Sequence, residues 1–334
     1  MKTIRSRMIA AMAGFGALLA AALLVAPVVG STSISLARVF DGSVPFADNV
    51  DAQIFFIARL PRVVAAALVG ASLAAAGVVF QALLRNPLAS PDTLGVSSGA
   101  ALGAMIAITF HLDVSVAGVP TMPLASLAGA VGALAIVYAL ATARRRGLSG
   151  TVLLLAGVTM TAFFSALILF TQYLADFTET FRTVRWLMGM LDVAGYAPIL
   201  AVLPMLAIAF GLFTTLPRPL DLISLGADAA AARGVDVVRA ERTALVSASL
   251  ATGAAVAISG PIAFVGIVVP HLVRLLVGSD HRIVLPGAAL FGAAFLIGCD
   301  LVARTAFSPV ELPVGVVTAL IGGPFFLWLL FHRM

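Results

Sequence analysis

Ionisable side chains are scarce inside the apolar stretches of this 334-residue chain, and few of them could do chemistry. Asp300 and Arg304 are four residues apart, so on a helix they share one face and can neutralise each other. His271 follows Pro270, where its ring can bond a backbone carbonyl that the proline leaves without a partner. Ion-coupled membrane carriers use carboxylates and histidines in such positions. An ion-coupled carrier therefore remains an alternative hypothesis, although the chain has few ionisable residues that could bind the coupling ion.

The sulfur-containing residues that could do chemistry are better explained as packing residues. Cys299 is the only cysteine, which excludes an intrachain disulfide and a cysteine metal site. Met188 and Met190 favour interfacial packing over haem ligation. Lys2 is the only lysine, and a phosphate-binding P-loop needs a lysine after its second glycine. We therefore expect no catalytic residue, no metal and no cofactor on this chain, and any use of ATP would need a separate subunit.

The composition predicts that these residues are positioned by membrane-spanning helices. The chain is 61% hydrophobic and 10% charged, with a mean hydropathy of +1.12, whereas soluble domains carry roughly 25% charged residues. Apolar runs long enough to cross a bilayer recur throughout. We predict an all-α membrane protein that forms a single transmembrane domain over residues 1–334. Its ten spans are expected at about 8–29, 60–84, 93–112, 122–143, 151–174, 196–216, 241–260, 263–277, 284–305 and 312–332.

The basic residues predict the orientation. With ten spans and a cytoplasmic N-terminus, 14 basic residues lie inside and 6 outside, which accounts for all 20. This bias places both termini in the cytoplasm. The first apolar run is longer than the 7–15 residues of a signal peptide's core, so we expect a retained helix. The inside set is Lys2, Arg5, Arg7, Arg85, Arg144, Arg145, Arg146, Arg218, Arg233, Arg239, Arg242, Arg274, Arg282 and Arg333.

Small residues and a weak internal echo indicate a closely packed bundle. Gly, Ala and Ser are abundant within the expected spans, and small residues let membrane helices approach closely. The sequence ALVGASLA from Ala67 returns as ALVSASLA from Ala244, in spans of opposite predicted direction. Such a pair is typical of an inverted repeat, although low-complexity segments also match by chance.

Several motifs are more specific than the composition. They are RLPRVVAAALVGASLAAAGVVFQALLRNPLASPDTLGVSSGA from Arg59, LLLAGV from Leu153, WLMG from Trp186, SLGADAAAARGV from Ser224, SGPIAFVGIVVPHLVRLLVGSDHR from Ser259 and ELPVGVVTALIGGPFFLWLL from Glu311. In this order, over roughly residues 50–332, they resemble the FecCD-type permeases of type II ABC importers, which take up ferric siderophores, haem and cobalamin. The resemblance implies the type II importer permease fold in a bacterial cytoplasmic (inner) membrane.

The resemblance also implies partners. A second permease subunit, expected to form a homodimer, would enclose the translocation path, and two cytoplasmic ATPase subunits would bind ATP and Mg. A soluble substrate-binding protein would deliver the metal chelate, and we expect no nucleic acid. Ferric siderophores are favoured, with haem and cobalamin as alternatives that no residue separates. A self-sufficient ion-coupled secondary transporter and a membrane receptor without transport remain the other hypotheses.

By position, the resemblance assigns three arginines to the outer face. Arg59, Arg62 and Arg304 match basic positions that meet acidic residues of the binding protein. All three lie at the outer ends of expected spans, where clustered guanidinium groups can grip carboxylates. The alternative is that they are arginines at helix ends that reach toward water.

The same resemblance assigns the polar segment 217–240 to ATPase coupling. Two short helices are expected there along the inner face, with an ordinary connecting loop as the alternative. Arg233 stands where the family usually has leucine, which puts the detailed contact in doubt. The coupling residues are Ser224, Leu225, Gly226, Ala229, Ala230, Arg233 and Gly234.

The gate and the path are assigned by resemblance as well. Asn86, Leu88, Gly150 and Thr151 match the cytoplasmic gate, with plain turn residues as the alternative. A short helix over 181–190, anchored at the membrane interface by Trp186, is expected beside the path. The path residues are Thr159, Phe163, Ser165 and Gln172.

Overall fold

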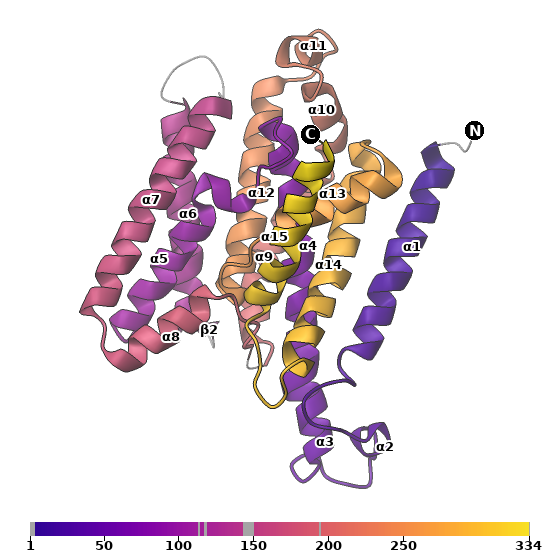
Figure 1. Cartoon of the computed structure of the whole chain (residues 1–334), viewed down its shortest axis with the longest axis vertical. Coiled ribbons are helices and arrows are strands. Elements are labelled where there is room, and N and C mark those ends of the chain that lie inside the picture. Colours follow the sequence, from indigo (N-terminus) through magenta and orange to yellow (C-terminus); the bar gives the residue numbers. More distant parts are fainter. Residues whose placement is uncertain (1–3, 113, 117–118, 143–149, 194, 334) are drawn as a thin grey trace.

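A computed structural model describes residues 4–112, 114–116, 119–142, 150–193 and 195–333. Long helices run side by side along its long axis, and short elements cap both ends (Figure 1). The helices are α1 (Ile4–Val25), α2 (Leu36–Val39), α3 (Val50–Gln53), α4 (Leu60–Leu83), α5 (Val96–Thr109), α6 (Thr121–Thr142), α7 (Gly150–Leu174), α8 (Phe177–Leu187), α9 (Ala197–Phe213), α10 (Pro217–Ile223), α11 (Ala227–Ala231), α12 (Val237–Ser259), α13 (Val265–Val277), α14 (His281–Thr305) and α15 (Val314–Arg333).

Three minor elements complete the described chain. A π-helical segment (Ile54–Arg59) joins α3 to α4, and a 3₁₀ turn (Pro91–Leu94) precedes α5. A two-residue hairpin pairs β1 (Ser115–Val116) with β2 (Val119–Pro120). Apart from this short hairpin, the described elements are helices, which confirms the expectation of an all-α protein.

Each of the ten expected spans corresponds to a helix, but their lengths differ. Among the described residues, six helical segments are long and apolar enough to cross a membrane, one of them formed by α3, the π-helical segment and α4 together. The bent pair of α9 and α10, at 58° to each other, would make a seventh. The apolar helices α5, α13 and α15 are shorter by this measure. A thirteen-residue helix such as α13 covers only about 20 Å of a hydrocarbon core of about 30 Å. Ten crossings therefore stays a prediction.

The ends of the bundle agree with the predicted orientation. In Figure 1 both chain ends lie at the end that carries α10 and α11, and α2, α3 and α8 lie at the opposite end. Lys2 and Arg144, Arg145 and Arg146, which the sequence assigns to the inner side, lie outside the described residues. We call the end with α10 and α11 the inner end and the other the outer end.

The core is organised around α4, which packs against α12, α13 and α14. Glycines make the close approach possible, because a Cβ on Gly70 would lie 2.2 Å from the carbonyl oxygen of Gly292, and one on Gly77 would lie 2.0 Å from that of Gly266. The predicted dense packing through small residues is confirmed. The two echo segments lie in α4 and α12, which run in opposite directions (Figure 1). This arrangement is compatible with an inverted repeat, which stays a prediction.

Candidate functional site

Four charged residues form a network at the outer end. Arg62 in α4 places Nε 2.8 Å from Oδ1 of Asp300 in α14, and its terminal nitrogen 2.6 Å from Oε2 of Glu311, which precedes α15. Arg304 approaches the other oxygen of Asp300 at 3.0 Å, so the predicted pairing of Asp300 with Arg304 is confirmed. The Asp300 side chain is 0% exposed. Its charge is thus neutralised between two guanidinium groups that join two helices.

Arg59 and Arg304 hold the end of α1. Beyond Val25 the chain has carbonyl groups without helical partners. Arg59 donates hydrogen bonds to the carbonyls of Pro27, Val28 and Thr32, and Arg304 donates to those of Ala26 and Val29. The two side chains therefore attach α1 to α4 and α14.

The three arginines that were predicted to contact a binding protein differ in their exposure. Arg59 and Arg304 are only 6% and 3% exposed, so they do not present their guanidinium groups at the surface as the predicted docking role requires. Arg62 is partly exposed. The buried arginines are used inside the chain because the carbonyls after α1 offer hydrogen bonds that water would otherwise supply. Contact of any of the three with a binding protein stays a prediction.

A hollow of about 530 Å³ lies beside the exposed edge of Arg62. It separates α8 from the segment that enters α15, and Arg185 and Asp192 face each other at 4.0 Å on its rim. Met188 and Met190 both line it. The remaining lining residues are Arg62, Phe181, Val184, Glu311 and Pro313.

The helix expected over 181–190 is found as α8, which starts earlier. Asp176 and Glu179 form a capping box at its first turn, which fixes its start at Phe177. Trp186 is 9% exposed and faces the bundle, so the prediction of an interfacial anchor is wrong. Phe177 and Phe181 are the exposed aromatic residues of this helix. Tertiary packing of its Thr183–Trp186 face decided which aromatic residue was buried.

The four predicted path residues lie on two sides of α7. Its buried face contains Leu153, Met160 and Phe164. At about 100° per residue, Thr159 and Phe163 flank that face on one side, and Ser165 and Gln172 flank it on the other. The two pairs therefore point in different directions. Thr159, Phe163 and Ser165 are exposed and Gln172 is half-buried, and their role in a path stays a prediction.

The inner end carries the segment predicted to couple to an ATPase, and it contains two short helices, α10 and α11, as expected. Ile223, Ala230 and Ala240 form a small core of their own beneath it. Leu225 is 64% exposed, whereas Ala230 is fully buried. Gly226 and Gly234 have φ of 124° and 80°, which allows the sharp turns on either side of α11. Arg233 and Ser224 are exposed, and Ala229 is half-buried.

The coupling segment is tied to the bundle by a link that the sequence analysis missed. Asp221 of α10 accepts a hydrogen bond from the backbone N–H of His281, and its carboxylate lies 2.6 Å from Nδ1 of that ring. Burial alone would raise the pKa of Asp221, but the hydrogen bonds from His281 and the charge of Arg282 outweigh it, so the pKa lies below its ordinary value. A separation of sixty residues leaves no local sequence signal for this pair.

The residues predicted to form the cytoplasmic gate do not close a passage within a single chain. Asn86 accepts a hydrogen bond from the backbone N–H of Leu88 through its side-chain oxygen, at 2.9 Å, as in a turn. Leu88 is 44% exposed. Gly150 starts α7, and the side chain of Thr151 lies outside the described part. His271, from the ion-coupling alternative, packs its ring against Phe325 with centroids 6.1 Å apart.

Comparisons with known proteins identify the family. The FecCD transport family matches residues 18–332. The cobalamin import permease BtuC of Halobacterium salinarum is 44% identical, over 82% of this chain and 72% of that protein. The hemin permease HmuU of Yersinia pestis is 42% identical over 82% of each chain. The Fe(3+) dicitrate permease FecD of Escherichia coli is 39% identical over 81% of this chain and 83% of that protein.

A solved structure agrees with these relatives. An inward-facing metal-chelate type ABC transporter superimposes with a TM-score of 0.81 and 33% identity, covering 98% of this chain and 99% of that one. The resemblance read from the motifs is thereby confirmed. The chain belongs to the FecCD transport family and is a multi-pass permease subunit of an ABC importer.

Proposed function

We propose that this permease moves a metal chelate from a soluble binding protein into the cytoplasm by alternating access. One observation carries the proposal: a partly exposed charged network at Arg62 and a coupling segment at α10–α11 lie at opposite ends of one bundle. An importer that receives its substrate at one membrane surface and is driven by ATP hydrolysis at the other needs its two contact sites at opposite ends of the bundle. We infer that the bundle lies in the bacterial cytoplasmic (inner) membrane.

Separate ATPase subunits supply the energy in this proposal. ATP and Mg are bound by those subunits, and this chain binds no cofactor of its own. The exposed Leu225 between α10 and α11 offers them an apolar contact, and Asp221 transmits movement of α10 to α14 through His281. Residues 217–240 thus act as the coupling segment of a single transmembrane domain.

A second copy of the chain completes the path. The exposed side of α7 carries Leu155, Phe163, Phe170 and Tyr173, which a bilayer or a second permease must cover. We propose a homodimer, with Thr159 and Phe163 facing the path between the copies. Arg62 and Arg185, at the rim of the outer hollow, meet acidic residues of the binding protein.

The chelate we favour is a ferric siderophore, with haem and cobalamin as alternatives. The relatives carry cobalamin, hemin and Fe(3+) dicitrate by name, which supports metal chelates as a class. The ion-coupled alternative would need a free carboxylate within the bundle. Asp300, the carboxylate that the sequence offered for this role, is instead ion-paired with both Arg62 and Arg304.

Reconstitution of the whole importer tests this proposal. The permease, its ATPase and its binding protein are placed in proteoliposomes with ATP on the ATPase side, and a ⁵⁵Fe-labelled ferric hydroxamate is supplied with the binding protein. Uptake against the gradient is expected with ATP and not with a non-hydrolysable analogue. Uphill uptake by the permease alone, driven by a proton gradient, would contradict the proposal.

A further inference from the structure

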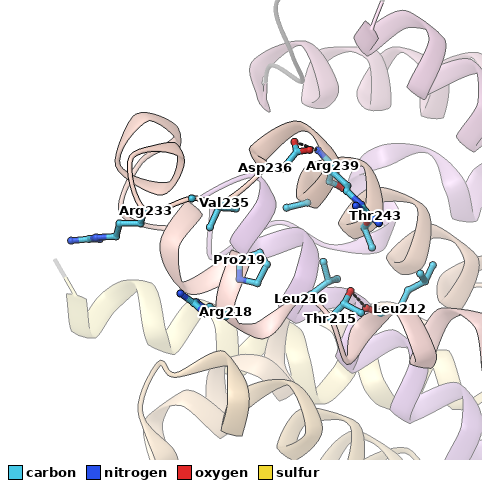
Figure 2. A pocket seen from close by; sticks show the side chains of 12 residues that line it. Leu212, Thr215, Leu216, Arg218, Pro219, Arg233, Val235, Asp236, Arg239 and Thr243 are labelled. Carbon is cyan, nitrogen blue, oxygen red and sulfur yellow. Dashed lines mark hydrogen bonds between the residues drawn. The ribbon is translucent and has the colours of Figure 1, made fainter.

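A second pocket lies at the inner end, on the side of the bundle where α9 meets α10 and α12. Its volume is about 500 Å³, and it is lined by Leu212, Thr215, Leu216, Arg218, Pro219, Arg233, Gly234, Val235, Asp236, Arg239, Ala240 and Thr243. Figure 2 shows Arg218 beside Pro219 on one side and Arg239 near Thr243 on the other, while Arg233 extends away from the other side chains. Two guanidinium groups thus flank an otherwise largely apolar hollow.

The positive charge of this pocket is not compensated within the described chain. Arg218, Arg233 and Arg239 outnumber Asp236, the one acidic residue of the lining. The Asp236 carboxylate accepts a hydrogen bond from the backbone N–H of Arg239 at 3.0 Å and so caps α12. Among the described residues, no ion pair or side-chain hydrogen bond involves the guanidinium groups of Arg218 or Arg239. The pocket therefore suits an anion.

An exposed apolar stripe leads along α9 to this pocket. Ile199, Val202, Leu206, Ala209 and Phe213 form the buried face of the helix. The opposite face exposes Leu200, Pro204 and Ile208, and it continues through Gly211 to Thr215 in the pocket lining. The spacing of three and four residues keeps this stripe on one side of the helix. A ligand that follows it has an apolar body and an anionic end.

We propose that the pocket binds the phosphate of an anionic glycerophospholipid, with an acyl chain along the exposed face of α9. This assignment uses the inner-end orientation of the proposed function, since it places the headgroup in the cytoplasmic leaflet. Anionic lipids are attracted to basic residues at that surface. Leu212 is half-buried, lines the pocket beside the arginines and contacts the glycerol and the first methylene groups. A free phosphate would leave the apolar lining and the stripe of α9 unused.

The site has a consequence for coupling. Val235 belongs both to the pocket lining and to the small core beneath α10 and α11. A lipid seated between α9 and α12 therefore contacts the support of the coupling segment. We infer that the lipid stabilises this segment in the position that receives the ATPase.

Native mass spectrometry of the full permease in detergent tests the proposal. Dioleoylphosphatidylglycerol is compared with dioleoylphosphatidylcholine, and glycerol 3-phosphate serves as a headgroup without acyl chains. At about five-fold per arginine, R218Q/R239Q should weaken phosphatidylglycerol binding roughly 25-fold. R242Q is the matched control, because Arg242 is exposed on α12 one turn farther on but lies outside the pocket. Phosphatidylcholine binding should be equal in all variants, which also shows that they are folded.

Four results would overturn the lipid site. They are equal binding of the two phospholipids, unchanged phosphatidylglycerol binding by R218Q/R239Q, equal loss in R242Q, and binding of glycerol 3-phosphate as strong as that of the lipid. Displacement of the lipid by added ATPase would assign the pocket to that protein and would also overturn the proposal. None of these readouts depends on transport, so they are independent of the proteoliposome experiment.

Discussion

Asp221 and His281 join the coupling segment to the first turn of α14 through one carboxylate oxygen, which lies 2.6 Å from Nδ1 and 3.1 Å from the backbone nitrogen of His281. Because α10 packs on α14, a push on the coupling segment reaches a helix that extends to the outer network at Asp300 and Arg304. In the proposed function, this pair connects the coupling segment to the helix that reaches the outer network.

Removal of this carboxylate should weaken the connection and make thermal stability less dependent on pH. Hydrogen bonds to a charged group contribute about 1.5–3 kcal/mol, so Asp221→Asn should lower stability by less than that amount at neutral pH. The lowered pKa of Asp221 means that its contribution is present above the ordinary value near 4 and disappears as pH falls through the folded pKa. The difference in melting temperature between the two proteins should shrink as the pH is lowered from 7 to 3, and a constant difference would contradict this account.

Loss of the buried carboxylate at the outer end should be far more damaging. Asp300→Asn leaves Arg304 without its carboxylate partner and leaves Arg62 with only the partly exposed Glu311, and breaking a buried pair in this way typically costs about 3–5 kcal/mol. Glu311→Gln is the control, since its partly exposed ion pair with Arg62 is worth about 1 kcal/mol or less. Thermal unfolding in detergent compares the two, and similar losses would show that burial does not set the difference.

The three outer arginines should separate into two classes. Arg62→Gln should slow association with the binding protein about five-fold at low salt, and it should also lower the melting temperature because the buried Asp300 loses one of its two guanidinium partners. Arg59→Gln should lower the melting temperature without slowing association, because it removes only the hydrogen bonds that hold the carbonyls of Pro27 and Val28. Surface plasmon resonance and thermal melting test this separation. An Arg59 variant of normal stability with weak docking would restore the original assignment.

The coupling segment can be tested at an exposed and a buried position. Leu225→Asp should reduce ligand-stimulated ATP hydrolysis of the assembled importer several-fold without unfolding the permease, because this side chain is exposed. Ala230→Asp places a charge in the small core with Ile223 and Ala240 and should disorder the segment itself. Limited proteolysis distinguishes the two effects. Unaltered stimulation in the Leu225 variant would contradict the proposed contact.

Close packing of α4 against α14 predicts opposite effects for two glycines of one helix. A Cβ on Gly292 would lie 2.5 Å from that of Ala74 and 2.6 Å from the carbonyl oxygen of Gly70, so Gly292→Ala should destabilise by about 1–3 kcal/mol. A Cβ on Gly298 meets no described atom within 4 Å. Gly298→Ala should therefore be neutral or stabilise α14 by about 0.5–1 kcal/mol. Equal melting temperatures for the two variants would argue against glycine-mediated contact.

The sequence by itself determined the helices, the class of protein and the family. Apolar length, positive charge bias and small residues are local properties, so they could be read without contacts. The positions of α10 and α11 and the pairing of Asp300 with Arg304 followed from local spacing as well. The shortness of α5 and the burial of Trp186 did not, because neighbouring helices decide where an apolar helix ends and which face it hides.

The tertiary structure alone decided which charged groups are available to partners. The sequence placed Arg59, Arg62 and Arg304 in one outer cluster, but only the fold brought the carbonyls that end α1 to two of them. Glu311 reached Arg62, and Asp221 reached His281, across 249 and 60 residues. The physical reason is that a buried charge must find a partner, and that partner is chosen by the packing of helices that are distant in the chain.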